Sequence, residues 1–363
     1  MPISVCKNIS LFFLLCVLLV SLGGCAVVTR NMPAPPLPLT PQEEARIGAA
    51  AEARLLQLLG GPYNDDALVS ELRRLCDQSA QGNHACKISI ADRSVPAVYS
   101  LPGGRIILTR GLLTEIHNDT ELDNLLAVSV QLSNEAYSAR ATMGMNEAIR
   151  EFLANADSPY DPDSASIRMA RLFERTSCAQ GCLDSVGLPG NGKVDPDRLP
   201  ASVRRLTELR PGYELLVRSR AIEEAGNHAQ AIASYLQAAT ISPDEPRILG
   251  ALGLAYLRAG QLQSARLYLQ RVVTLQPDYY QTLMGLGYCF LQSQKNLQAD
   301  KTLTKSVGLL PVPENLFLLA EAREKTGDLE TAKALYQKVV EEGRNSKFGR
   351  TAAGRLAKLA GGQ

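Results

Sequence analysis

A fixed spacing of three prolines constrains the fold of this chain more than any other feature of its sequence. Pro243, Pro277 and Pro311 each end an apolar stretch, and 34 residues separate each proline from the next. Proline cannot continue a helix, so each one marks the end of a helical segment. A period of this length is typical of stacked helix pairs, in which each pair buries its apolar face only against its neighbours.

Small and large apolar residues recur inside each period at matching offsets. The second period has Leu252, Gly253, Tyr256, Gly260, Ala265, Leu269 and Val272, and the third repeats much of this set one period later. This pattern resembles the tetratricopeptide repeat, in which Gly and Ala stand where two helices cross. The sequence therefore predicts an all-α solenoid over residues 211–363, with about four repeats and a capping helix at 346–360.

The preceding segment, residues 42–210, lacks this period and mixes two kinds of pattern. Stretches 42–59, 65–78, 121–141 and 165–177 have helical spacing of apolar residues, whereas 87–92, 97–101 and 105–109 alternate as strands do. We expect an α+β domain here, mostly helical with a small sheet.

Two motifs in this segment resemble a family of zincin metallopeptidases, that of the β-barrel assembly-enhancing protease, which joins a peptidase domain to tetratricopeptide repeats. One is the run Tyr99-Ser-Leu-Pro-Gly-Gly-Arg-Ile-Ile-Leu-Thr-Arg-Gly-Leu-Leu113, and the other is Gln42-Glu-Glu-Ala-Arg-Ile-Gly48. The resemblance covers about residues 42–190 and implies a zincin-like fold for the domain at 42–210.

The metal-binding motif of that family is missing from this chain. In the family, the next helix carries His-Glu-x-x-His, whose two histidines share one helix face and bind zinc. Here the corresponding places are held by Val128, Ser129 and Leu132. Valine and leucine cannot coordinate a metal, and a serine cannot replace the glutamate as a base.

The third zinc ligand of the family is a glutamate on a later helix, and an ungapped count places Glu174 there. One carboxylate does not make a zinc site, and the chain contains only three histidines. We therefore expect no metal, no cofactor and no catalytic residue, and the resemblance implies a pseudoprotease. An active zinc metalloendopeptidase with unusual ligands is the remaining enzymatic alternative.

The first 25 residues have the pattern of a lipoprotein signal. An unbroken apolar run from Leu11 to Val20 precedes Leu-Gly-Gly-Cys25, which resembles the lipobox of bacterial lipoproteins. We expect cleavage after residue 24, acylation of Cys25, and a proline-rich tether up to residue 41. Ala26 follows the cysteine, and by the same resemblance this favours the periplasmic face of the outer membrane.

Export to an oxidising compartment would allow the other cysteines to pair. Cys76 and Cys86 flank a short polar loop and are expected to form a disulfide. Cys178 and Cys182 are four residues apart, and they can pair only if the helix ends at Gly181. Cys289 lies in an apolar helical stretch and is expected to be a buried free thiol.

The expected binding surface is the concave face of the repeats. Counting helix positions by resemblance to other tetratricopeptide proteins predicts a protein-binding groove at Arg247, Leu254, Arg258, Met284, Tyr288 and Leu291. The alternative is that part of this face packs against the preceding domain. The 38 basic and 37 acidic residues give no excess charge for binding nucleic acid, and no small-molecule substrate is expected.

The sequence thus favours a non-catalytic, membrane-anchored scaffold with protein partners. The resemblance implies a role in outer-membrane protein assembly or quality control. A pilotin-like lipoprotein of a secretion or pilus system is the alternative.

Overall fold

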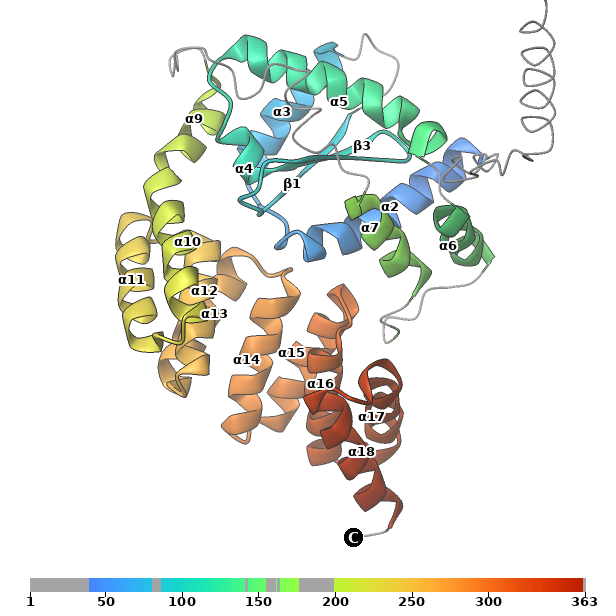
Figure 1. Ribbon diagram of the computed structural model, residues 1–363, viewed down its shortest axis with the longest axis vertical. Helices are drawn as coiled ribbons and strands as arrows, with labels where there is room; N and C mark the ends of the chain where they lie inside the picture. Colours follow the sequence, from blue (N-terminus) through green and yellow to red (C-terminus); the bar gives the residue numbers. More distant parts are fainter. Residues whose placement is uncertain are drawn as a thin grey trace, which may run out of the picture. The chain divides into compact units, whose positions relative to one another are not determined.

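A small sheet enclosed by helices is followed along the chain by a series of paired helices (Figure 1). The computed structural model describes residues 39–79, 86–140, 143–154, 161, 164–175 and 199–361, all of which belong to one compact unit. In this part of the chain, no helix combines the length and the apolar character that crossing a membrane requires.

The sheet contains three strands in the order β1-β3-β2. Strand β3 (Arg105–Thr109) runs parallel to β1 (Lys87–Ala91) and antiparallel to β2 (Val98–Leu101). Strands β2 and β3 are joined by a tight turn in which Gly103 and Gly104 have φ angles of 75° and 73°. Residues other than glycine rarely adopt these φ angles, so the Pro-Gly-Gly sequence allows the tight turn of the hairpin.

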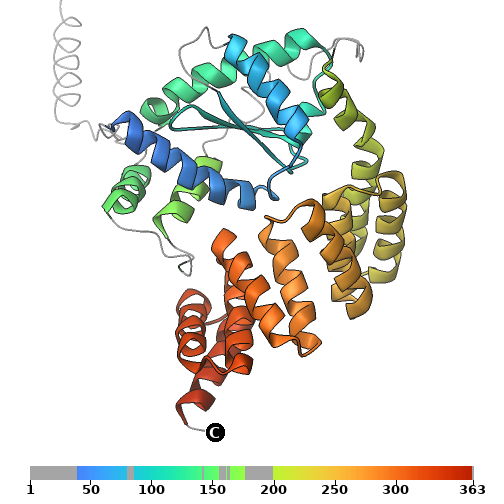
Figure 2. The ribbon, with the colours of Figure 1, turned by 180° about the vertical axis from the view of Figure 1, so that it is seen from behind.

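Each face of the sheet is covered by its own group of helices (Figures 1 and 2). Helices α3 (Asp66–Ser79), α5 (Asp119–Arg140) and α9 (Ala201–Glu208) cover one face, where they bury Ile106 and Leu108. Helices α2 (Pro41–Leu58), α6 (Met143–Ala154) and α7 (Ala165–Arg175) cover the other face and bury Ile107. The alternation along β3 thus supplies two separate apolar cores.

The two motifs that carry the zincin resemblance meet in space. A methyl group added to Gly48 of α2 would lie 2.0 Å from the carbonyl oxygen of Pro102 in the β2–β3 turn. Only a glycine allows this approach, so Gly48 lets α2 lie directly on the turn.

The helices between residues 210 and 360 form four antiparallel pairs and a final single helix. The pairs are α10 (Arg210–Glu224) with α11 (His228–Ile241), α12 (Pro246–Arg258) with α13 (Leu262–Leu275), α14 (Tyr280–Gln292) with α15 (Asn296–Leu309), and α16 (Pro313–Thr326) with α17 (Leu329–Gly343). Helix α18 (Lys347–Ala360) packs on the last pair.

Close helix crossings hold the second and the third repeat together. A Cβ atom added to Gly253 would lie 2.9 Å from Cγ of Leu269, and one added to Gly287 would lie 2.5 Å from Cγ of Leu303. The two glycines are one period apart, as are the two leucines. Cys289 of α14 is a free, buried thiol.

A disulfide joins the end of α3 to the start of β1. Cys76 and Cys86 are bonded, and their Cα atoms are 6.1 Å apart. Cys25, Cys178 and Cys182 lie outside the described residues, so their acylation and pairing stay predictions.

Candidate protein-binding site

The place of the missing zinc motif on α5 is occupied by helix packing. Ser129 is 1% exposed, and its hydroxyl donates a hydrogen bond of 2.6 Å to the carbonyl oxygen of Leu125. Val128 is half-buried, and the side chain of Leu132 lies outside the described residues. The serine hydroxyl is therefore used within its own helix.

Glu174 has a structural partner in place of a metal. Its carboxylate lies 3.2 Å from a guanidinium nitrogen of Arg93, and the same nitrogen donates to the hydroxyl of Tyr99. Among the described residues, no three or more His, Cys, Asp and Glu side chains come together in a way that could hold a metal ion.

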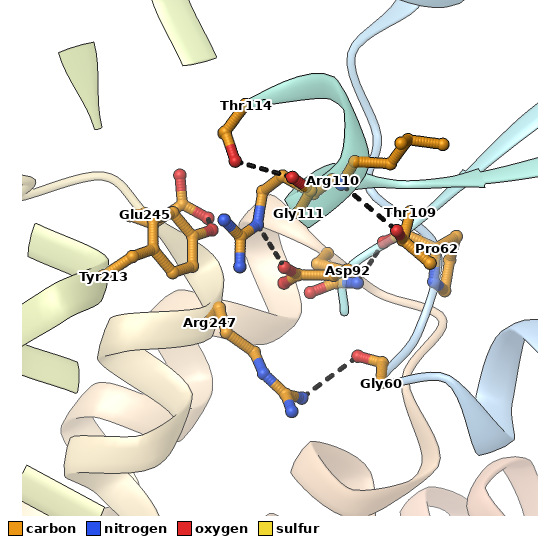
Figure 3. Close-up of polar contacts among 12 residues, drawn as sticks. Gly60, Pro62, Asp92, Thr109, Arg110, Gly111, Thr114, Tyr213, Glu245 and Arg247 are labelled. Carbon is orange, nitrogen blue, oxygen red and sulfur yellow. Dashed lines mark hydrogen bonds and ion pairs between the residues drawn. The ribbon is translucent and has the colours of Figure 1, made fainter. Parts of the chain in front are cut away.

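A buried polar cluster joins the sheet to the first two repeats (Figure 3). Arg110, on the short helix α4 (Arg110–Leu113), donates through Nε to Asp92 at 2.9 Å, and both side chains are almost completely buried. The guanidinium of Arg110 stacks on the ring of Tyr213 of α10, 3.1 Å from its centroid. Tyr213 in turn donates a hydrogen bond of 2.5 Å to Glu245, directly before α12.

The protonation of this cluster depends on burial. Burial, together with the charge of Asp92, raises the pKa of Glu245 to about 7. Burial and the same carboxylates raise the pKa of Tyr213 well above its usual value, so its hydroxyl stays a donor at neutral pH.

A second row of contacts joins the end of α2 to the second and third repeats. Gln57 donates to the carbonyl oxygen of Asp278 at 2.7 Å and accepts from the backbone of Tyr280 at 3.0 Å. Arg247 donates to the carbonyl oxygen of Gly60 at 3.2 Å, and Gln276 donates to that of Pro62. Side chains from each part thus bind the backbone of the other, which fastens the repeats to the sheet and its covering helices, together called the α/β part.

Between these contacts lies an open space of about 680 Å³ that we call the junction cavity. Its walls come from the end of α2, the loop after β1, the short helix α4, both helices of repeat one, and the first helices of repeats two and three. Arginines and tyrosines dominate its polar lining: Arg93, Arg110, Arg220, Arg247, Arg258, Tyr235, Tyr279 and Tyr280. Five guanidinium groups and only two carboxylates, those of Glu223 and Glu224, line this cavity, which gives it a cationic character.

A second, smaller space of about 310 Å³ continues from the cavity along the repeats. We call it the apolar groove, and its apolar lining is Leu254, Leu257, Met284, Tyr288, Leu318 and Phe348. Leu254, Arg258 and Gln281 line both spaces. The concave face therefore offers one continuous surface that is cationic at the α/β part and apolar towards the C-terminus.

Five of the six residues predicted for the binding groove line these spaces. Leu254 and Arg258 line both, and Met284 and Tyr288 line the apolar groove. Arg258 also pairs with Glu223 at 2.6 Å.

One groove prediction needs correction, and another residue of the predicted groove has an additional structural role. Leu291 is only 2% exposed and packs with α15 and α16, because the end of α14 turns this side chain towards the fourth repeat. Arg247 lines the junction cavity, but it also binds Gly60 and Tyr279 within the chain. At Arg247, therefore, part of the concave face packs against the α/β part.

Sequence reasoning missed Arg220 of α10. It lines the junction cavity, and it stands one 34-residue period before Leu254. Counting groove positions back by one period into the first repeat would have identified Arg220. The repeat pattern in α10 is weak, so this position was not recognised as part of the groove.

Comparison with known proteins identifies the repeats. Tetratricopeptide repeat families match residues 223–287 and 314–344. The chain thus contains tetratricopeptide repeats, a class of helical module that serves protein–protein interaction. Both matches lie outside residues 42–210, so the zincin resemblance stays a prediction.

Individual relatives match only in part. Over 68 residues, the chain is 34% identical to the BBSome complex member bbs-4 of Caenorhabditis elegans. The matched segment makes up 19% of this chain and 15% of that protein. A MamA fragment from Desulfovibrio magneticus RS-1 is similar in structure, with 20% identity and a TM-score of 0.34 over 41% of this chain and 93% of the other. PilW, a type IV pilus biogenesis factor, has 14% sequence identity and a TM-score of 0.33, and the match covers 64% of this chain and 91% of PilW.

Proposed function

We propose that this protein is a non-catalytic adaptor that binds a segment of a partner protein on the concave face of its repeats. The open apolar groove carries this proposal. Leucine, methionine, tyrosine and phenylalanine side chains line a concave space there, and such surfaces suit an extended peptide or a partner helix.

Site-specific photocrosslinking in whole cells tests the proposal. A crosslinker placed at Tyr288 in the groove should trap a discrete partner, whereas one placed at Leu267, exposed on α13 outside both spaces, should not. Met284→Asp should abolish the Tyr288 product, because a carboxylate would be buried among apolar side chains.

Crosslinks that form equally from Tyr288 and Leu267, or that persist in Met284→Asp, would show that the groove is not the binding site. Circular dichroism of the variant checks that the helices remain folded.

The adaptor is proposed to be anchored by lipid at Cys25, on the periplasmic face of the outer membrane. The lipobox supports the anchor, and three acyl chains would hold the protein firmly at a bilayer. Mass spectrometry of the mature protein should find a chain that begins at acylated Cys25. A soluble mature chain that begins elsewhere would overturn this part of the proposal.

The α/β part is proposed to be a zincin-derived platform that has lost catalysis, with a role in outer-membrane protein assembly or quality control. Valine at the first ligand position and the engagement of Glu174 by Arg93 support this reading. The purified protein should contain no stoichiometric zinc and should not cleave casein. Stoichiometric zinc in the wild-type protein would refute it.

A further inference from the structure

Two arginines of the junction cavity lack an acidic partner among the described residues. Arg220 of α10 makes no hydrogen bond or ion pair there, although it is half-buried. Arg247 of α12 binds only the carbonyl oxygen of Gly60 and the hydroxyl of Tyr279, which are neutral groups. Both guanidinium groups line the same cavity.

The other cationic groups of the cavity already have carboxylate partners. Arg110 pairs with Asp92, Arg258 with Glu223, and Arg93 with Glu174. Glu245 accepts a hydrogen bond from the hydroxyl of Tyr213. Glu224 is exposed at the end of α10. After these pairs are formed, Arg220 and Arg247 remain without a carboxylate partner among the described residues.

The positive charge of Arg220 is unfavourable in its surroundings. Burial, and then repulsion by Arg247, lower the pKa of Arg220. Two cations held close together beside an open cavity are therefore a ready site for an anion, since a bound anion would relieve the repulsion.

We propose that the junction cavity binds a carboxylate of the same partner segment that occupies the apolar groove, with Arg220 and Arg247 as its ligands. This inference rests on the proposed adaptor function and names the chemistry of the partner: a segment in which an acidic group is followed by apolar side chains. The carboxylate belongs either to an Asp or Glu side chain or to a chain terminus.

The shape of the site favours a protein segment over a small ion. The cavity is far larger than one anion, and it opens into the apolar groove through Leu254, Arg258 and Gln281. Val95 and Val217, each 54% exposed, add apolar surface to its lining. Guanidinium groups bind carboxylates through two parallel hydrogen bonds, which gives the acidic group a defined position.

Peptide selection tests the inference. Random dodecapeptides displayed on phage are selected on the full chain, purified in detergent, and on two variants. Arg220→Gln removes the cavity charge, and Arg218→Gln removes an exposed charge from the same helix outside the cavity. Arg247 is left intact because it also fastens α2 to the repeats.

We expect wild-type and Arg218→Gln proteins to select apolar peptides enriched in Asp or Glu, and Arg220→Gln to select apolar peptides without acidic enrichment. A synthetic form of the best peptide should bind Arg220→Gln at least tenfold more weakly by fluorescence anisotropy. Its Asn or Gln analogue should lose a similar factor in wild type. Peptides with free or amidated ends distinguish a terminal from a side-chain carboxylate.

Each other outcome is decisive. Apolar peptides without acidic enrichment in wild type would overturn the carboxylate site and leave the adaptor function standing. Acidic peptides that bind Arg220→Gln as well as wild type would also overturn it. A failure to enrich any peptide would contradict both proposals. A thermal midpoint of Arg220→Gln at or above that of wild type shows that lost binding does not come from unfolding.

Discussion

The turn inside the third repeat shows how one residue can depart from the rule of its repeat. Gly226, Gly260 and Gly327 occupy the turns of the other repeats with positive φ, whereas Gln294 has φ 58° at the corresponding place. A side chain in this region is strained, and glycine is not.

Gln294→Gly should therefore stabilise the protein by about 0.5–1 kcal/mol. Chemical denaturation monitored by circular dichroism measures the change. Gln298→Gly, in the exposed first turns of α15, is the control and should destabilise by a similar amount. Destabilisation by both substitutions would show that the turn does not favour glycine.

The residues of the binding site were only partly predictable from sequence. Helix period alone places Leu254, Met284 and Tyr288 on the concave face, and the structure agrees. It cannot show that Leu291 turns into the core or that Arg247 binds Gly60, because both outcomes depend on neighbouring elements. Arg247 and Gly60 are 187 residues apart, and Leu291 packs against later helices of the repeats, so no local pattern records either contact.

At the scale of helices, the close crossing inside the third repeat depends on a missing side chain. A methyl group at Gly287 would lie 2.5 Å from Leu303, whereas one at Gly354 of α18 would meet no atom within 4 Å. Gly287→Ala should thus cost about 1–3 kcal/mol by overpacking. Gly354→Ala should instead stabilise by about 0.5–1 kcal/mol, since alanine restricts the unfolded chain and favours the helix. Thermal melts of both variants provide the comparison, and equal effects would contradict the crossing geometry.

The disulfide between α3 and β1 closes a short loop. A loop of this size restricts the unfolded chain by about 3 kcal/mol in the chain-entropy description. Replacing Cys76 and Cys86 by alanine should lower the free energy of unfolding by about 2–3 kcal/mol. Urea denaturation measures the loss, and dithiothreitol should destabilise the wild type but not the double variant. Equal sensitivity of both proteins would show that this bond is not the one being reduced.

The elements themselves were largely visible in the sequence. The alternating strands, the Pro-Gly-Gly turn and the 34-residue period correspond to β1, β2, β3 and the helix pairs. These features are local, since each follows from residues within one or two turns of chain. The order β1-β3-β2 is not local, because it depends on which strands pair across the intervening segments.

In the whole molecule, the α/β part and the repeats are coupled through the cluster of Arg110, Asp92, Tyr213 and Glu245. The carboxyl group of Glu245 is buried, and its pKa is raised to about 7. The folded state therefore favours the protonated form of this group more than the unfolded state does. Its contribution to stability is complete below the ordinary pKa near 4.5, and it is lost as pH rises through about 7.

Glu245→Gln should consequently stabilise the protein at pH 8 by on the order of 2 kcal/mol, and have little effect below pH 5. The amide keeps an oxygen that can accept the hydroxyl of Tyr213 without the charge that repels Asp92. Thermal melts between pH 4.5 and 8.5 should show that the wild type loses stability over this range more steeply than the variant. Glu330→Gln, at an 88% exposed side chain on α17, is the control and should follow the wild-type profile. If Glu245→Gln is instead less stable than wild type at pH 8, the ionised carboxylate is needed to hold Arg110, and the two parts are joined by charge attraction across the cluster.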